Sequence, residues 1–377
     1  MNRINIFNLD IGYSEKKYVN ECLKSGWLSF EGKYVKKFEN EFEKLIGDGF
    51  ALTTSNGTTA LELTLSTLGV TYGDEVIISD FSFAAPINAI ISVGAKPVIV
   101  DISKSSWCID TDKILKSITK KTKAILMVHT YGIIANIEEI KKISKKKKLF
   151  LIEDCAESLG AKYKSKLYGL SGDCSTYSFF PNKTITTGEG GMIIFKKKNH
   201  FEKARILRNQ GRKKNNKNFF HIMPGYNARM SNINAAIGYA QIKKIKQYLI
   251  KRKKLFSLYD YYLKNSGLFE MIPVPKNTEN SYWLYTLKIK NFTKSKRDKL
   301  IVKLLQDGIE TRPAFYPLSE MKAYKKYIHK KYYISNQISS SILSLPTSLD
   351  LKKNKVKKIS NLLIKHTEKL NKGLKYK

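Results

Sequence analysis

Short apolar runs alternate with amphipathic stretches between about residue 35 and residue 200. This alternation is typical of strand–helix units on a mostly parallel β-sheet. The runs that we interpret as strands are Phe50–Thr53, Val76–Ser79, Pro97–Val100, Ala124–His129, Leu149–Glu153, Thr176–Phe180 and Met192–Phe195. Helical periodicity is readable in Tyr34–Ile46, Thr58–Leu68, Pro86–Val93 and Ile137–Lys147. The pattern therefore predicts an α/β fold with one wide, seven-stranded sheet.

The pattern changes after about residue 245. A long, lysine-rich helical stretch, Gln241–Lys264, ends at turn-forming residues and is followed by two prolines. Beyond it we expect a strand at Tyr282–Ile289, a helix at Arg297–Gln306 and a proline-punctuated loop at Thr311–Pro317. The chain should therefore divide into a large domain, residues 1–245, and a smaller α+β domain, residues 246–377.

The composition permits this arrangement, because 377 residues of which 42% are hydrophobic suffice for two cores. No run of about 18 consecutive apolar residues occurs, and the N-terminal segment lacks the zones of a secretion signal. We therefore expect a cytoplasmic protein that does not enter a membrane. The four cysteines are widely spaced and form no Cys-Cys or Cys-His pattern, which predicts structural thiols and neither disulfides nor a metal site.

The formal net charge of +36 raises the question of nucleic acid. Only eight of the 68 basic residues are arginine, whereas proteins that grip phosphates and read bases usually rely on arginine as well. The lysines are spread along the chain, as solvated surface charges are. We therefore expect no nucleic-acid partner, although the charge can attract an anionic nucleotide ligand.

Two segments carry a more specific pattern. In FLIEDCAESLGAKY an apolar strand delivers Glu153 and Asp154 at its carboxyl end, where open α/β sheets bind ligands. In GDCSTYSFFPNKTITTGEGGMIIF a strand reaches Ser178, and Lys183 follows in a constrained stretch rich in Pro, Asn and Gly. Taken singly, the aspartate fits a helix cap and the lysine a surface residue.

Together these residues match the needs of pyridoxal 5'-phosphate, which requires a lysine for its aldehyde, a carboxylate for its ring nitrogen, a flat side chain against the ring and donors for the phosphate. Asp154 can keep the ring nitrogen protonated. The turn Thr53–Thr58 places the N–H groups of Gly57 and Thr58 at a helix N-terminus, where a phosphate is stabilised. The alternative for this turn is ordinary N-capping.

Over nearly its whole length the chain resembles the nucleotide-sugar aminotransferases of fold type I. The matching phrases are SGWLSFEGKYVKKFENEF, SNGTTALELTLSTLGV, GDEVIISDFSFAAPINAI, GAKPVIVDI, IEDCAESLGA, SFFPNKTITTGEGGM, PGYNARMSNINAAIGYAQ, and SYWLYTL with GIETRPAFYPL. The resemblance implies a fold type I aminotransferase that uses pyridoxal 5'-phosphate, with glutamate as amino donor and a nucleotide-linked keto sugar as acceptor.

The resemblance also implies roles for single residues. Lys183 and Asp154 would be catalytic, the first by binding the cofactor aldehyde and moving a proton, the second by pairing with the ring nitrogen. The cofactor-binding set that it implies is Gly57, Thr58 and Ser178 on the phosphate, Phe83 on the ring, Glu157 near the ring hydroxyl, and Asn227 on the phosphate from the neighbouring subunit. The last role implies a homodimer with shared active sites. Taken alone, Phe83 fits a core position, Ser178 a strand hydroxyl and Asn227 a turn former.

On the substrate side, NKTITTGEGGM and GIETRP are similar to the family members that aminate C4 of GDP-4-keto-6-deoxymannose to give GDP-perosamine for a surface polysaccharide. A UDP- or TDP-linked keto sugar is the alternative acceptor. Arg312 and Tyr316 are expected beside the nucleotide sugar, although an arginine closing a surface turn is the alternative for Arg312. Ser319 and Ala228 stand where the family usually has His and Tyr, so the sugar and the nucleotide stay open.

Two rival functions fit parts of the sequence. A sugar dehydratase of the same fold carries His in place of the cofactor-binding lysine, and Lys183 argues against it. A non-catalytic regulator that binds the cofactor or a nucleic acid would need recognition elements outside the enzyme pattern, and we see no helix-turn-helix extension. A transaminase is therefore the function that the sequence favours.

Overall fold

A computed structural model describes residues 3–213 and 218–372. Its large sheet has seven strands in the order β1-β9-β8-β5-β4-β2-β3. Neighbouring strands from β8 to β3 pair in parallel, and β9 runs antiparallel to both β8 and β1. The bounds are β1 Phe50–Thr54, β2 Glu75–Ser79, β3 Lys96–Val100, β4 Thr122–Val128, β5 Phe150–Asp154, β8 Cys174–Ser178 and β9 Gly191–Phe195. The predicted seven-stranded, mostly parallel sheet is confirmed, with strand ends that move by one or two residues.

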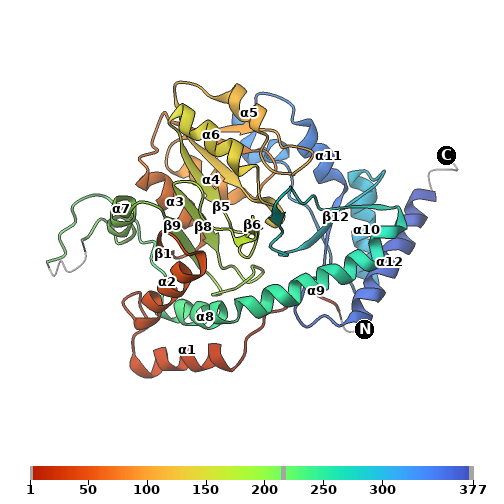
Figure 1. The fold of residues 1–377 in the computed structure, drawn as a ribbon, viewed down its shortest axis with the longest axis horizontal. Coiled ribbons are helices and arrows are strands. Elements are labelled where there is room, and N and C mark those ends of the chain that lie inside the picture. Colours follow the sequence, from red (N-terminus) through yellow and green to blue (C-terminus); the bar gives the residue numbers. More distant parts are fainter. Residues whose placement is uncertain (1–2, 214–217, 373–377) are drawn as a thin grey trace.

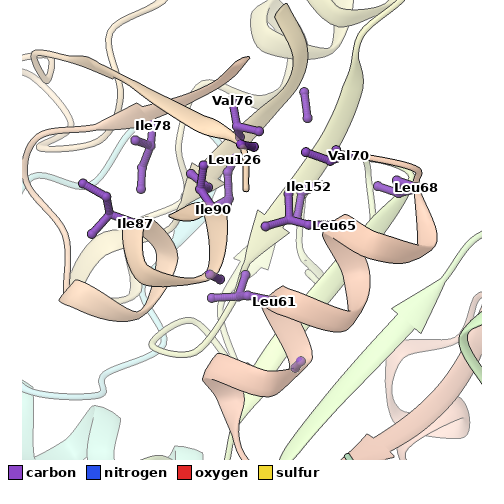
Figure 2. Close-up of a cluster of buried hydrophobic side chains, with 14 of the residues drawn as sticks. Leu61, Leu65, Leu68, Val70, Val76, Ile78, Ile87, Ile90, Leu126 and Ile152 are labelled. Carbon is purple, nitrogen blue, oxygen red and sulfur yellow. The ribbon is translucent and has the colours of Figure 1, made fainter. Parts of the chain in front are cut away.

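Helices cover both faces of this sheet, which is why its central strands are continuous apolar runs. Along β2, Val76 and Ile78 point into one core cluster and Ile77 into the other. Figure 2 shows the first cluster, in which helices α3 and α4 pack on the strands. Helices α5 and α6 cover the opposite face, and α2 and α8 cover the end of the sheet near β1 and β9.

The four helices predicted between residues 34 and 147 are confirmed, with ends that differ by at most two residues. The bounds in this part of the chain are α1 Tyr13–Ser25, α2 Lys33–Ile46, α3 Gly57–Thr67, α4 Ala84–Ser92, α5 Thr111–Ser117, α6 Ile137–Lys147, α7 Lys198–Arg208 and α8 Asn232–Lys243, with the short helix η1 at Thr130–Gly132. Helix α1 lies outside the layers and packs on α8 (Figure 1). The stretch Gln241–Lys264, predicted as one helix, is two helices that meet at Lys244.

A second, smaller sheet follows in the chain. Helix α9, Ile245–Leu263, runs from α8 toward α10, α12 and β12 (Figure 1). The small sheet is antiparallel in the order β10-β12-β14-β13, with β10 Phe269–Met271, β12 Tyr285–Ile289, β13 Arg312–Pro313 and β14 Ile342–Leu345. The helices here are η2 Lys264–Ser266, α10 Lys294–Gln306, η3 Leu318–Glu320, η4 Lys322–Tyr327, α11 Tyr333–Ser341 and α12 Lys353–Lys372.

Three details of this part differ from the prediction. Strand β12 begins at Tyr285, three residues late, because Tyr282 has a left-handed backbone with φ of 57°. Helix α10 begins at Lys294, because the Thr293 side chain accepts a hydrogen bond from the Lys296 N–H and caps it. The expected loop at 311–317 contains β13, a two-residue edge strand on which a proline is tolerated.

Two smaller features complete the fold. A three-stranded sheet in the order β11-β6-β7 joins Thr278–Glu279 (β11) to Lys162–Tyr163 (β6) and Lys166–Leu167 (β7). The N-terminal segment lies against the second sheet region, where Ile4 pairs with Ile309. Within the described residues, no helix has the length and apolar character needed to cross a bilayer. All four cysteines are buried and free.

Candidate active site

Three titratable side chains meet at the carboxyl edge of the large sheet. Asp154 is the last residue of β5, Glu157 follows in the next turn, and Lys183 lies in the loop after β8. Both carboxylates are buried, and Lys183 is half-buried and close enough to interact electrostatically with each. The structure thus brings together the amine and the two carboxylates that the sequence singled out.

Burial dominates the electrostatics of this group. It lowers the pKa of the Lys183 amine, against the opposing effect of the Glu157 and Asp154 carboxylates. It raises the pKa of Asp154, which the Ala156 N–H and Lys183 counteract, and it raises the pKa of Glu157 to about 7. A lysine whose neutral form is favoured in this way can act as a nucleophile or as a base.

Glu157 is held by Tyr131, a residue that we did not single out from the sequence. The Tyr131 N–H donates to Glu157 Oε2 at 2.6 Å. Tyr131 has a φ of 52°, a left-handed conformation that a bulky residue rarely adopts. Its ring is buried in a stack, with centroids 5.8 Å from Trp283 and 5.0 Å from Phe315. Such strain persists where the surrounding packing fixes it, often at functional sites.

Trp283 contacts Lys183 as well as Tyr131. The amine lies 4.2 Å from the centroid of the Trp283 ring, and the indole N–H donates to the Asn182 carbonyl at 2.7 Å. Trp283 precedes β12, so the smaller sheet region supplies one wall around the lysine. The sequence analysis quoted SYWLYTL for its resemblance but gave Trp283 no role.

The turn between β1 and α3 forms a close-packed cradle with the end of β8. A Cβ added at Gly57 would lie 2.8 Å from Cβ of Ser178, so only glycine fits there. Asn56 caps α3, because its side chain accepts from the Thr59 N–H at 2.8 Å. Ordinary N-capping, the alternative for this turn, is therefore carried out by Asn56. Gly57 and Thr58 form the first turn of the helix beside Ser178.

Phe83 is an exposed aromatic residue. Its side chain is 59% exposed, it precedes the first residue of α4, and its ring centroid is 5.9 Å from that of Phe315. The alternative of a plain core residue is therefore wrong for Phe83, and the buried aromatic in this stretch is Phe81. An exposed aromatic ring leaves one face available to a flat ligand.

A hydrogen-bonded network beneath Asp154 fixes the strand ends. Glu153 accepts hydrogen bonds from the Tyr168 hydroxyl and the Gly172 N–H, and it lies 3.2 Å from His129 Nε2. His129 Nδ1 accepts the Ala135 N–H, so Nε2 must carry the ring proton and donate to Glu153. Although burial alone would raise the pKa of Glu153, these donors hold it below its ordinary value. Sequence reasoning missed the role of His129, whose only signal was its place as the last residue of a predicted apolar strand.

The remaining predicted residues lie elsewhere. Asn227 is exposed, and its Oδ1 accepts from Arg229 Nε at 3.1 Å and Nη2 at 2.8 Å. Arg312 forms an ion pair with Glu310 at 3.6 Å and stays 45% exposed. Tyr316 is exposed, with Lys294 over its ring. In the described part of the chain, no recorded hydrogen bond, ion pair or ring contact joins Asn227, Arg312 or Tyr316 to Lys183.

The residues present fit pyridoxal phosphate. The amine of Lys183 interacts electrostatically with two buried carboxylates, the cradle at Gly57 excludes any side chain, and Phe83 offers an exposed ring. Lys183, Asp154, Glu157, Phe83 and the β1–α3 turn are therefore the residues able to hold the cofactor.

Comparisons with known proteins agree with this geometry. The family model described as "DegT/DnrJ/EryC1/StrS aminotransferase family" matches residues 9–363. The chain is 39% identical to a GDP-perosamine synthase of Escherichia coli O157:H7, covering 94% of this chain and 96% of that one. It is 37% identical to a GDP-perosamine synthase of Vibrio cholerae, covering 96% and 98%. Among solved structures, the PLP form of Spr1654 from Streptococcus pneumoniae, a candidate sugar aminotransferase, superposes with a TM-score of 0.93 at 26% identity, covering 98% and 99%.

Proposed function

Because the chain belongs to the DegT/DnrJ/EryC1/StrS aminotransferase family, we propose that it moves an amino group from glutamate to the keto carbon of GDP-4-keto-6-deoxymannose, giving GDP-perosamine. The enzyme is a transaminase that depends on pyridoxal phosphate. The likeness to two proteins named GDP-perosamine synthase over more than nine-tenths of the chain supports this acceptor. The product would serve the synthesis of a surface polysaccharide such as O-antigen or capsule.

Pyridoxal phosphate supplies an electron sink and a carrier for the amino group when it is bound. Lys183 Nζ would bind the cofactor aldehyde and, when free, take a proton from the amine-bearing carbon and return it, because burial lowers its pKa toward a neutral amine. The Asp154 carboxylate would hold the proton on the ring nitrogen. Glu157, whose Oε2 is fixed by the Tyr131 N–H, would orient the ring through its hydroxyl.

The phosphate and the ring face would be held by residues from three elements. The N–H groups of Gly57 and Thr58 begin α3, and the Ser178 hydroxyl ends β8 beside them. Together they would provide short donors at a helix N-terminus, where a phosphate is favoured. Phe83 would stack on the ring from the exposed side.

We also propose a homodimer with shared sites, in which Asn227 reaches the phosphate bound by the partner chain. Asn227 is exposed and makes no recorded hydrogen bond to the site of its own chain within the described residues. Nearby, a cavity of about 1060 Å³ is lined by Phe30, Arg208 and Phe219. Trp27 and Phe219 are largely exposed, and a second copy of the chain would cover them.

We place the reaction in the cytoplasm. All four cysteines are free thiols, which suits a reducing compartment. Glutamate and nucleotide sugars are small, anionic substrates, and the net charge of +36 would attract them.

The test uses the purified protein loaded with pyridoxal phosphate. Glutamate should shift its visible absorption band, and a GDP-linked 4-keto-6-deoxyhexose should then reverse the shift. UDP- and TDP-linked 4-keto-6-deoxyhexoses are the matched controls and should be poorer acceptors. If the GDP sugar is the poorest of the three, the perosamine assignment is wrong and the transaminase assignment stands. A band that does not respond to glutamate would mean a cofactor binder without this activity.

A further inference from the structure

Asp80 is a buried carboxylate that the proposed chemistry does not use. It follows β2, three residues before Phe83, and its side chain is 0% exposed. Ser319 of helix η3 donates to it twice, from its N–H to Oδ1 at 2.8 Å and from its hydroxyl to Oδ2 at 2.9 Å. The Leu318 N–H donates to the Asp80 carbonyl at 2.8 Å. Three hydrogen bonds therefore tie the strand end that leads to Phe83 to a segment far along the chain.

A second carboxylate, Asp101, plays a matching part at the end of the neighbouring strand β3. Its Oδ1 accepts from the Ser335 N–H at 2.9 Å and from the Ser335 hydroxyl at 2.6 Å, and its Oδ2 accepts from the Ile334 N–H at 3.0 Å. These donors begin α11, so Asp101 fixes that helix to the sheet. Further along α11, the Ser339 hydroxyl donates to the Phe315 carbonyl at 2.7 Å.

The segment 313–319, which we term the wall segment, is therefore held at both ends. At its start, the Phe315 N–H donates to the Tyr131 hydroxyl at 3.1 Å, and the Phe315 ring stacks on Tyr131 and touches Phe83. At its end, Ser319 is bound to Asp80. Tyr316, at the middle of the wall segment, is 39% exposed. The position of this segment thus depends on both ties.

We propose that Ser319 is a positioning residue that determines which nucleotide sugar is accepted, because its two hydrogen bonds to Asp80 set the wall segment relative to Phe83. This inference rests on the proposed function, since it concerns the acceptor of that reaction. Ser319 reaches neither the cofactor residues nor Lys183 by any recorded contact among the described residues. It acts through the segment that carries Phe315 and Tyr316.

The hydrogen bonds between Ser319 and Asp80 explain why a hydroxyl matters at position 319. A carboxylate that accepts both an N–H and an O–H forms charge-assisted bonds, which are stronger than neutral ones. Removing the hydroxyl leaves Oδ2 of a buried carboxylate without that donor, a costly state that the wall segment can relieve only by shifting. Threonine keeps the hydroxyl and should keep the position.

The hydrogen bonds between Ser319 and Asp80 should also weaken at low pH. Burial and, to a smaller extent, the neighbouring Asp101 charge raise the pKa of Asp80 to about 6, although the donors from Ser319 and Ser335 oppose this shift. The Tyr332 hydroxyl faces the same two carboxylates. Because the Ser319 donors favour the charged carboxylate, protonation below about pH 6 weakens the tie. Asparagine at position 80 imitates the uncharged form at every pH.

The test measures the two halves of the reaction separately in the loaded enzyme. Ser319→Ala should raise the KM for the nucleotide sugar by about tenfold, the range for a lost hydrogen bond to a charged group, and leave the glutamate-induced absorption change within about twofold. Ser319→Thr should restore the wild-type KM. Ser340→Ala is the matched control, because it removes an exposed hydroxyl on α11 that bonds only to the Gln337 carbonyl.

The second part of the test is the pH dependence of the KM for the nucleotide sugar. The wild-type KM for the nucleotide sugar should rise as the pH falls through about 6, and that of Asp80→Asn should stay high and flat. An unchanged acceptor KM in Ser319→Ala, with normal transamination, would overturn the inference while leaving the proposed function intact. If Ser319→Ala does not fold, the Ser319→Thr and Asp80→Asn variants still test the inference. A Ser319→Thr variant whose KM for the nucleotide sugar differs from wild type would contradict it. An Asp80→Asn variant with the wild-type pH profile would also contradict it. If the wild-type enzyme shows no response to glutamate, the proposed function fails instead.

Discussion

Glu157→Gln should stabilise the cofactor-free protein above pH 7. Burial raises the pKa of Glu157 to about 7 from an ordinary value of 4.5, so folding favours the protonated carboxyl. The contribution of that group to stability is fully present below about pH 4.5 and is lost as the pH rises through about 7. Glutamine keeps an oxygen that can accept the Tyr131 N–H, and it carries no charge at any pH.

The size of the effect follows from the pKa difference. A shift of one pKa unit corresponds to about 1.4 kcal/mol. The raised pKa of Glu157 therefore lowers the free energy of unfolding by roughly 3 kcal/mol at pH 8 and by roughly 1 kcal/mol at pH 5.5. The variant should therefore gain about 3 kcal/mol of unfolding free energy at pH 8 and about 1 kcal/mol at pH 5.5. An active-site carboxylate that destabilises the fold in this way is a residue kept for its chemistry.

Urea unfolding of the cofactor-free wild type and variant, at one protein concentration and at both pH values, measures these free energies. Equal concentrations matter because a dimer's stability depends on concentration. The loaded enzyme is the control for activity and should lose turnover in the variant. A variant that is less stable than wild type at pH 8, or whose gain is the same at both pH values, would refute the reasoning.

Three further predictions concern the proposed roles. Lys183→Ala should lose the glutamate-sensitive absorption band and lower turnover by several powers of ten, and near-normal activity would refute the assignment. Asp154→Asn should lower turnover by at least about a hundredfold, because a neutral partner cannot hold the ring nitrogen's proton, and wild-type turnover would place the ring elsewhere. Mixing Lys183→Ala with Asn227→Ala should recover roughly a quarter of the wild-type activity, since half of the dimers are hybrids with one intact site. No recovery after proven subunit exchange would count against shared sites.

The large sheet was predictable because its strands are buried on both faces. A strand such as β2 must be apolar at consecutive positions, and the sequence shows that run directly. Strand ends were less predictable because they depend on pairing. Strand β8 begins at Cys174, two residues earlier than predicted, since Cys174 pairs with both Ile152 and Phe195. No local pattern reports those two partners.

The proximity of the three titratable residues was predictable for a related reason. Asp154, Glu157 and Lys183 follow strands whose carboxyl ends must meet at one edge, so their proximity follows from the topology. The supports of these residues were not predictable. Tyr131 is fixed by Phe315, which is 184 residues away in the sequence, and its left-handed backbone has no sequence signal. The roles of Asn227 and the division near residue 245 stay predictions.

The substrate side is where the sequence was least informative, and the structure gives a physical reason. Ser319 stood out only as a departure from a pattern, whereas in the fold it binds Asp80, which precedes Phe83 by three residues. A change at position 319 can therefore move the wall segment without touching Lys183 or Asp154. In the proposed function, cofactor chemistry depends on contacts at strand ends, and acceptor choice depends on contacts between distant loops. Relatives that share the first can for that reason differ in the second.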